Sequence, residues 1–235
     1  MRNLIKTLVL MLMLSFSHAA IAGDFEDGLA AYEKQDFSTA LRLLTPIAEK
    51  GDAVAQTILG MWYAEGIGVA QDYKTAVKWY TLAAEQGNAS AQFNLGYMYA
   101  NGQGVAQDYK TAVKWYTLSA EQGYAQAQNN LGVMYGDGQG VAQDYKTAVK
   151  WYTLAAEQGN ALAQFNLGLM NAEGKGVLKN YVKAHMWWSM ATIASSSENA
   201  MLYRDDLVKL MTPSQIAEAQ EAASLCIKQN FKNCD

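Results

Sequence analysis

The sequence predicts an all-α protein: an α/α superhelical solenoid of stacked helical hairpins, built from 36-residue repeats and closed by a C-terminal capping helix. Two observations support this prediction. First, the segment QDYKTAVKWYTLAAEQGNASAQFNLGYMYANGQGVA begins at Gln71, and closely similar segments begin at Gln107 and Gln143, each 36 residues after the one before. Second, apolar residues within each copy recur at the three- and four-residue spacing of one helical face. A fixed period of this length is typical of a stack of similar supersecondary units.

Each copy encodes two helices. Asp72 is expected to cap the first, helix A, because its short side chain can accept hydrogen bonds from backbone N–H groups that lack intrahelical partners. Gly87 is expected to end it, since glycine adopts the left-handed conformation without a Cβ clash. Asn88 should cap the second, helix B, which stops at Gly102, and Gly96 should let a neighbouring helix approach closely. The expected core positions are Tyr73, Ala76, Val77, Tyr80, Ala83 and Ala84 on helix A, and Ala91, Leu95, Met98 and Tyr99 on helix B.

A single hairpin cannot close a core by itself, so its apolar faces have to be covered by the preceding and the following units. Trp79, Trp115 and Trp151 form a ladder at the repeat period. Packing between repeats is one interpretation of this ladder, and a platform for a ligand is the other.

The repeat also carries a resemblance to a known family. Its pattern A-x-x-W-Y-x-x-A-A-E-Q-G-x-A-x-A-Q-x-x-L-G-x-M-Y-x-x-G-x-G-V is similar to the Sel-one-like repeat (SLR), a relative of the tetratricopeptide repeat. The resemblance implies an α/α superhelix that is used mainly as a binding scaffold. It does not by itself imply an enzyme, because function depends on sites rather than on the fold.

Residues 1–22 have the features of a secretory signal peptide. Two basic residues precede an apolar run over residues 8–16, and a small-x-small motif at residues 20–22 ends before Gly23. The apolar run is shorter than a transmembrane helix requires. We therefore expect an exported, periplasmic or secreted protein that begins at Gly23 and has no membrane span after signal removal. An uncleaved N-terminal anchor, which would make the protein a membrane-tethered regulator, is the alternative.

The remaining chain shows no linker or low-complexity segment. Pro46 is expected to interrupt a helix and to kink it near Thr45. Thr212, Pro213 and Gln215 match a capping box with proline at the first helical position. The expected divisions are an N-terminal capping helix at residues 23–34, a diverged repeat at 35–70, repeats at 71–106, 107–142 and 143–178, a degenerate repeat at 179–211, and a C-terminal capping helix with a disulfide at 212–235.

The two cysteines, Cys226 and Cys234, both lie in the last of these segments. In an exported chain, an even pair this close in sequence predicts a disulfide, with two free thiols as the alternative. Eight residues of continuous helix would hold the pair about 12 Å apart, which is beyond bridging distance. The helix is therefore expected to stop near Gln229 or Asn230, after which the chain folds back.

The composition gives no support for catalysis, a cofactor or a metal site. Of the 2 histidines only His185 remains once residues 1–22 are removed, whereas a zinc site needs three or four clustered ligands. Gly102 and Gly104 lack the lysine of a phosphate-binding loop. The prediction is therefore that the protein is not an enzyme. A hydrolase acting on a cell-wall or β-lactam substrate, an activity credited to some cysteine-rich relatives in the family that it resembles, is the alternative.

The charge balance argues against nucleic acid as a partner. The net charge of the whole chain is −4, from 18 basic and 22 acidic residues. Removing residues 1–22 takes away two basic residues and no acidic one, which leaves −6. Nucleic-acid binding depends on basic surfaces that displace counterions.

Two surfaces are candidates for binding an unidentified protein or peptide. The first is the outward side of helix A, because helix A lines the concave groove in the tetratricopeptide relatives; its lysines could receive acidic side chains or a C-terminal carboxylate. The second is a stripe of helix B on which the three copies differ, at the spacing of one helical face. Either surface could instead be a solvated face without a partner. The helix A residues are Lys74, Lys78, Leu82, Lys110, Lys114, Leu118, Lys146, Lys150 and Leu154, and the helix B residues are Phe93, Tyr97, Phe165 and Leu169.

Overall fold

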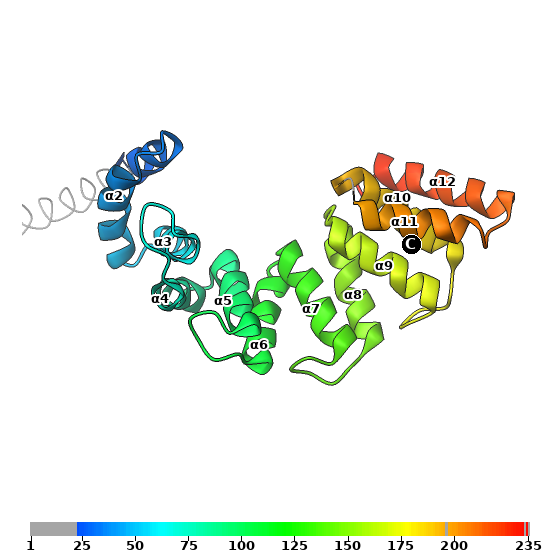
Figure 1. The fold of residues 1–235 in the computed structure, drawn as a ribbon, viewed down its shortest axis with the longest axis horizontal. Helices are drawn as coiled ribbons and strands as arrows, with labels where there is room; N and C mark the ends of the chain where they lie inside the picture. Colours follow the sequence, from blue (N-terminus) through cyan, green and yellow to red (C-terminus); the bar gives the residue numbers. More distant parts are fainter. Residues whose placement is uncertain (1–22, 196, 233, 235) are drawn as a thin grey trace, which may run out of the picture. The chain divides into compact units, whose positions relative to one another are not determined.

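The computed structural model describes residues 23–195, 197–232 and 234, so the predicted signal peptide lies outside the described residues. Within these ranges the regular structure is helical, with no strand (Figure 1). Residues 23–33 are helical. They are followed by α2 (Phe37–Glu49), α3 (Ala53–Glu65), α4 (Tyr73–Glu85), α5 (Ala89–Asn101), α6 (Tyr109–Glu121), α7 (Ala125–Asp137), α8 (Tyr145–Ala156), α9 (Ala161–Glu173), α10 (Tyr181–Ser195), α11 (Glu198–Val208) and α12 (Pro213–Lys228).

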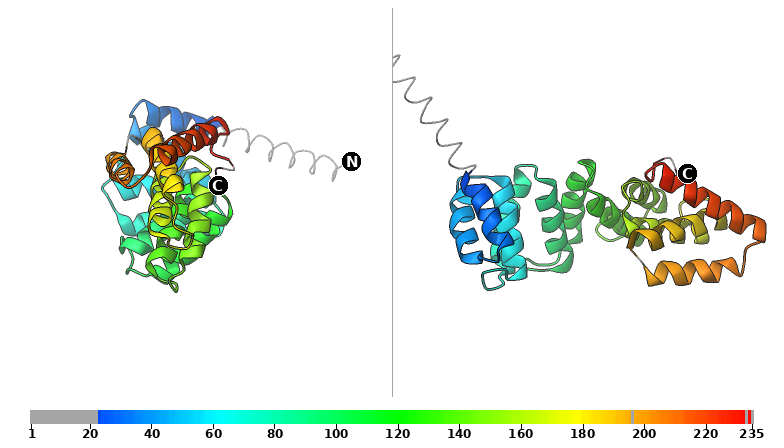
Figure 2. Two further views of the ribbon diagram at one scale, coloured as in Figure 1. Left: turned by 90° about the vertical axis from the view of Figure 1, so that its right-hand side faces the viewer. Right: turned by 90° about the horizontal axis from the view of Figure 1, so that it is seen from above.

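The helices form two compact units. The described part of the first comprises residues 23–98 and 102–106, and the second comprises the remaining described residues from Tyr99 onward. In the first unit α3 packs against α2 and α4; in the second, each of α6 to α10 packs against the next helix. Both α11 and α12 pack against α10, and the views in Figure 2 show this end of the second unit. Stacked helical hairpins of this kind confirm the predicted solenoid class.

The helix ends of the first copy follow the predicted capping pattern, whereas in the middle copy Tyr124 replaces Asn88 and α7 has no side-chain cap. The Asp72 carboxylate accepts hydrogen bonds from the backbone N–H groups of Lys74 and Thr75, at 2.9 and 3.2 Å. The Asn88 side chain accepts from the backbone N–H of Ala91 at 2.9 Å. Gly102 ends α5 in the left-handed conformation, with φ of 66°. Each of these groups satisfies backbone atoms that the helix itself leaves unpaired.

Successive hairpins meet where an aromatic ring lies on a glycine. A Cβ atom added to Gly132 in α7 would lie 2.6 Å from Cε1 of Tyr152 in α8, so no other residue fits there without displacement. Gly60 and Tyr80 make the same contact between α3 and α4. Close approach of neighbouring helices at this position of helix B, which the sequence predicts from Gly96, is therefore confirmed at two equivalent glycines.

Pro46 does not interrupt its helix, and this expectation was wrong. The helix α2 runs through Pro46 and ends only after Glu49. Proline removes one backbone donor, but Ile47 and Ala48, which follow it, are both buried in the core of the first unit. Their burial holds the last turn in place. Trp79 also packs against this core, which supports the packing interpretation of the tryptophan ladder at that position.

The C-terminal end has the predicted capping helix and disulfide. A capping box joins Thr212 and Gln215 at the start of α12, and the helix ends at Lys228. Asn230 and Phe231 have positive φ values of 52° and 65°, which reverse the chain. Cys226 and Cys234 then form a disulfide across a Cα–Cα distance of 5.1 Å, and Phe231 packs against the core of the second unit. Both the pairing and the fold-back are confirmed.

Buried glutamines add a hydrogen-bond relay between neighbouring repeats. Gln128 in α7 is 4% exposed; its amide nitrogen donates to the Ala120 carbonyl at 3.1 Å, and its oxygen accepts from the Gln158 amide at 2.8 Å. Gln56 and Gln86 repeat the second bond in the first unit, also at 2.8 Å. This relay of hydrogen bonds thus joins the B helix of one hairpin to the turn between the A and B helices of the next hairpin.

The relay ends at the degenerate repeat. Gln164 in α9 donates to the Ala156 carbonyl at 3.3 Å, but its buried oxygen accepts no hydrogen bond in the described part of the chain. The position that would supply the donor, 36 residues after Gln158, is Ala194. Loss of the glutamine therefore coincides with the last hairpin of the array.

Gln158→Ala is expected to lower the free energy of unfolding by about 1–3 kcal/mol, because the buried Gln128 oxygen would lose its donor. Urea denaturation of the purified chain measures this change. Gln126→Ala is the matched control, since Gln126 is exposed on α7, and should change the free energy by less than about 0.5 kcal/mol. Equal effects of the two substitutions would contradict the relay.

Candidate functional site

The helix A residues named from the sequence lie on the surfaces of α4, α6 and α8. Leu82 is 46% exposed, and Leu118 and Leu154 are each 37% exposed. The six lysines of the set, Lys74, Lys78, Lys110, Lys114, Lys146 and Lys150, are all exposed. Each of these helices therefore presents two ammonium groups and an apolar side chain to solvent. Their contact with a partner stays a prediction.

Two of the lysines lie over tryptophan rings on the same helix. The Lys114 ammonium is 5.3 Å from the centroid of the Trp115 ring, and the Lys150 ammonium is 5.9 Å from that of Trp151. Exposed cation–π contacts of this kind are worth about 0.5–1 kcal/mol. They give these flexible lysines a preferred position without removing their charge from solvent.

The alternative helix B stripe is only partly a surface. Tyr97 is 45% exposed, but Phe93 is half-buried. Phe165 and Leu169 pack against the buried cluster formed by α10, α11 and α12, and the Phe165 ring meets Tyr203 edge-on at 5.4 Å. The degenerate repeat covers these two residues.

The position equivalent to Phe93 and Phe165 in the middle copy is Asn129, which is 5% exposed. Its amide donates to Asn130 at 3.2 Å, and its oxygen accepts from Asn166 at 3.1 Å. The prediction that the stripe lies at or near the surface is therefore wrong at Asn129. Variation between copies marked positions where packing differs as well as positions that face solvent.

His185 lies inside α10 and is 3% exposed. Burial, followed by the nearby charge of Arg204, lowers its pKa below the ordinary value, while Asp205 acts in the opposite direction. The Ser189 hydroxyl donates to the His185 carbonyl at 2.9 Å, an interaction within the helix. His185 lines neither of the two cavities described below, and no observation favours the hydrolase alternative.

The described residues meet neither the requirements of a metal site nor those of a membrane-spanning helix. They contain no group of three or more histidine, cysteine or acidic side chains placed to hold a metal ion. None of their helices is both long enough and apolar enough to cross a membrane.

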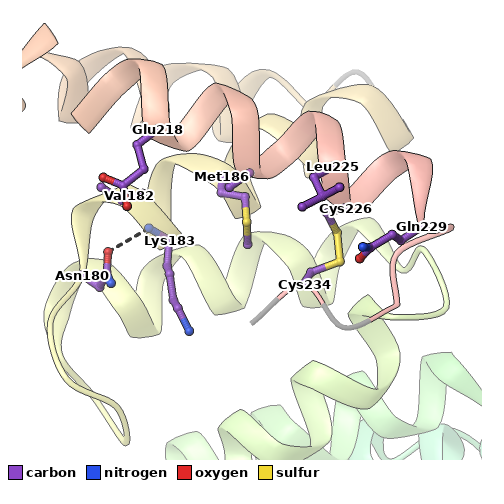
Figure 3. Close-up of a pocket in the computed structure, with 10 residues that line it drawn as sticks. Asn180, Val182, Lys183, Met186, Glu218, Leu225, Cys226, Gln229 and Cys234 are labelled. Carbon is purple, nitrogen blue, oxygen red and sulfur yellow. Dashed lines mark hydrogen bonds between the residues drawn. A yellow bond between two sulfur atoms is a disulfide. The ribbon is translucent and has the colours of Figure 1, made fainter. Parts of the chain in front are cut away.

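One cavity, of about 250 Å³, lies between α10 and α12 (Figure 3). The disulfide and Gln229 lie at one end, Asn180 and Glu218 lie at the other, and Met186 is between them. The Asn180 side chain is committed to capping α10, because it accepts from the backbone N–H of Lys183 at 2.9 Å. The fold-back after α12 therefore closes a small, mainly apolar hollow. Its other lining residues are Val182, Lys183, Ala222, Leu225, Cys226 and Cys234.

A second cavity, of about 400 Å³, lies wholly within the first unit. Tyr73, Tyr80 and Tyr97 line it, and Glu65, in the last turn of α3, adds a carboxylate. Burial, with a smaller contribution from Glu65, raises the pKa of Tyr80, so its hydroxyl stays protonated. Of this set, the sequence made only Tyr97 a candidate binding residue, whereas Tyr73, Tyr80 and Met98 were expected in the core. The remaining lining residues are Ala64, Gln71, Asn94, Met98 and Gln103.

The fold defines a class of protein: an α-solenoid repeat protein built from stacked helical hairpins. The Sel1 repeat family model matches five consecutive segments, at residues 19–52, 53–88, 89–124, 125–160 and 161–195. The chain belongs to the Sel1 repeat family.

Solved structures agree with this assignment. A Sel1 repeat protein from Oxalobacter formigenes is 35% identical with a TM-score of 0.71, and the match covers 77% of this chain and 74% of that one. The antigen c5321, a protective antigen of uropathogenic Escherichia coli that displays an SLR fold, is 33% identical with a TM-score of 0.79; the match covers 94% of this chain and 52% of that one. The chain thus spans about half the length of c5321. A comparison with curated proteins found no match.

The buried His185 predicts a loss of stability below neutral pH. The unfolded chain binds a proton at the ordinary histidine pKa of about 6.5, whereas the folded chain, with a lowered pKa, resists protonation. Stability is therefore fully present above about pH 6.5 and falls as the pH drops below it.

Urea denaturation at pH 7.5 and at pH 5.0 tests this expectation. The free energy of unfolding of the wild type should be lower at pH 5.0 than at pH 7.5. The same difference should be smaller for the His185→Gln variant, because this substitution removes the only histidine of residues 23–235. Hydrogen bonds from Thr75, above all, lower the pKa of Asp72 below its ordinary value, so this capping carboxylate stays ionised at both pH values. An identical loss in both proteins would contradict the role of His185.

Proposed function

We propose that this protein is an exported repeat scaffold that binds a protein or a peptide in the cell envelope. Sel1 repeats are generally scaffolds for protein–protein interaction, and this chain has five of them. The observation that carries the proposal is the set of exposed lysine and leucine side chains on α4, α6 and α8. Apolar side chains beside exposed ammonium groups suit a segment that is acidic and partly apolar.

The chemistry of this surface favours a peptide with acidic side chains or a free C-terminal carboxylate. Lysine ammonium groups are compact donors on flexible stems, so they adapt to carboxylates in several positions. The half-buried rings of Trp115 and Trp151 keep two of the ammonium groups close to the helix surface. A partner carboxylate would meet these groups without ordering a fully extended side chain.

Export is supported by the signal-like composition of residues 1–22. Protein recovered from the envelope fraction should begin at Gly23 when its N-terminus is sequenced. A chain that keeps Met1 and stays with the membrane would instead support the tethered regulator. A periplasmic and a fully secreted location both agree with this proposal.

Replacing Lys78, Lys114 and Lys150 together by Glu is expected to abolish capture of the partner from an envelope extract, because the surface would then repel carboxylates. The melting temperature should stay within about 2–4 °C of the wild type, since exposed charges contribute little to stability.

Mass spectrometry of the captured proteins gives the readout for this variant. Replacing Lys50, Lys228 and Lys232 by Glu is the matched control, because it changes the net charge equally at exposed lysines outside the set. Capture that survives the first change, or that is lost equally in both variants, would contradict a specific role for the helix A surface.

A further inference from the structure

The cavity of the first unit has a counterpart in which a lysine of the chain itself sits on the tyrosine. In the third copy, Tyr145 stands where Tyr73 stands in the first, and Lys175 replaces Gln103. The Lys175 ammonium lies 5.5 Å from the centroid of the Tyr145 ring and forms an ion pair with Glu173 at 2.7 Å. This place in the repeat therefore accepts an ammonium group.

A second lysine occupies the same kind of place one repeat later. Tyr181 is the next equivalent of Tyr73, and Lys179 stands at the position of Gln71. The Lys179 ammonium lies 4.8 Å from the centroid of the Tyr181 ring. Two sequence positions that differ between repeats thus place a primary ammonium over the same tyrosine.

In the first unit both lysine positions carry neutral amides. The Gln71 amide donates to the Tyr73 hydroxyl at 3.1 Å and to the Ala64 carbonyl at 2.8 Å, so it is already committed. Glu65 is exposed, and its carboxylate forms no ion pair within the described part of the chain. The cavity has the ring and the negative charge that attract an ammonium group, and none of its lining residues is a lysine.

We propose that this cavity, lined by Glu65, Tyr73 and Tyr97, binds the ammonium group of a lysine side chain from a partner. The negative face of an aromatic ring attracts a cation, and a nearby carboxylate adds to that attraction. The volume of about 400 Å³ admits the aliphatic stem of a lysine, and the partly exposed Tyr97 offers it an apolar wall. The middle copy lacks this chemistry, because Asn101 and Val133 replace Glu65 and Tyr97.

This inference extends the proposed binding function by one recognition element. It uses a defined probe instead of the natural partner and residues outside the helix A set. If the lysine peptide does not bind, the proposed scaffold function is unaffected. If the substitutions of the helix A lysines do not change partner capture, the titration with the lysine peptide is still a valid test of the cavity.

The probe is the capped tripeptide acetyl-Gly-Lys-Gly-amide, titrated into the ¹⁵N-labelled mature chain. The backbone amide signals of Glu65, Tyr73 and Tyr97 should shift together along one binding curve. The same peptide acetylated on the lysine Nζ keeps the shape of the stem but has no charge, and it should bind about tenfold more weakly. Equal shifts with both peptides would overturn the assignment.

Two matched substitutions locate the site. Gln103→Lys should block the probe, because it installs the internal ammonium group that Lys175 supplies in the third copy. Gln139→Lys makes the same change in the middle copy, where Asn101 stands at the position of Glu65, and should leave binding unchanged. Glu65→Gln should weaken binding several-fold, and this loss should shrink as the salt concentration rises. Unchanged affinity in Gln103→Lys, with its melting curve intact, would overturn the proposal.

Discussion

The contact on which each unit depends is an aromatic ring of one helix A that packs on a glycine of the preceding helix B. Tyr80 on Gly60 and Tyr152 on Gly132 leave no room for a Cβ atom, so the two backbones approach as closely as an aromatic ring allows. Trp188 on Gly168 makes a tighter version at the degenerate repeat, and its indole N–H donates to the Phe165 carbonyl at 3.1 Å. A hairpin without this contact would leave one apolar face in water, and the array would end there.

The ends of the array show how the chain stops such a stack. The glutamine relay that joins one hairpin to the next loses its donor at Ala194, and the next turn does not resemble the earlier ones. The capping helix α12 then covers α10, while the disulfide holds the returning tail against the core of the second unit. The array therefore ends where the hydrogen bond between glutamines of neighbouring hairpins is lost, and where the packing of α12 on α10 and the disulfide take its place.

Near-identical copies also explain how recognition can differ along the chain. The same tyrosine position carries an internal lysine in two places, neutral neighbours in one, and a carboxylate with a second tyrosine in the first unit. A change of one or two side chains near this tyrosine alters the charge of the group that can bind there. The contacts between aromatic rings and glycines, which hold neighbouring helices together, stay the same. The exposed lysines of α4, α6 and α8, in contrast, are the same in every copy.

The sequence by itself determined the helices, their caps, the repeat period, the capping helix and the disulfide, because each depends on residues close together in the chain or on a repeated spacing. Tertiary structure alone decided which of the varied positions face solvent. Asn129 is buried, and Phe165 packs against residues of α10, α11 and α12, although both lie on the helix B stripe that was a candidate binding surface. Pro46 stayed within its helix for the same reason, since Ile47 and Ala48 are fixed by core contacts. The tyrosine cavity joins residues from α3, α4 and α5, and only packing brings these together.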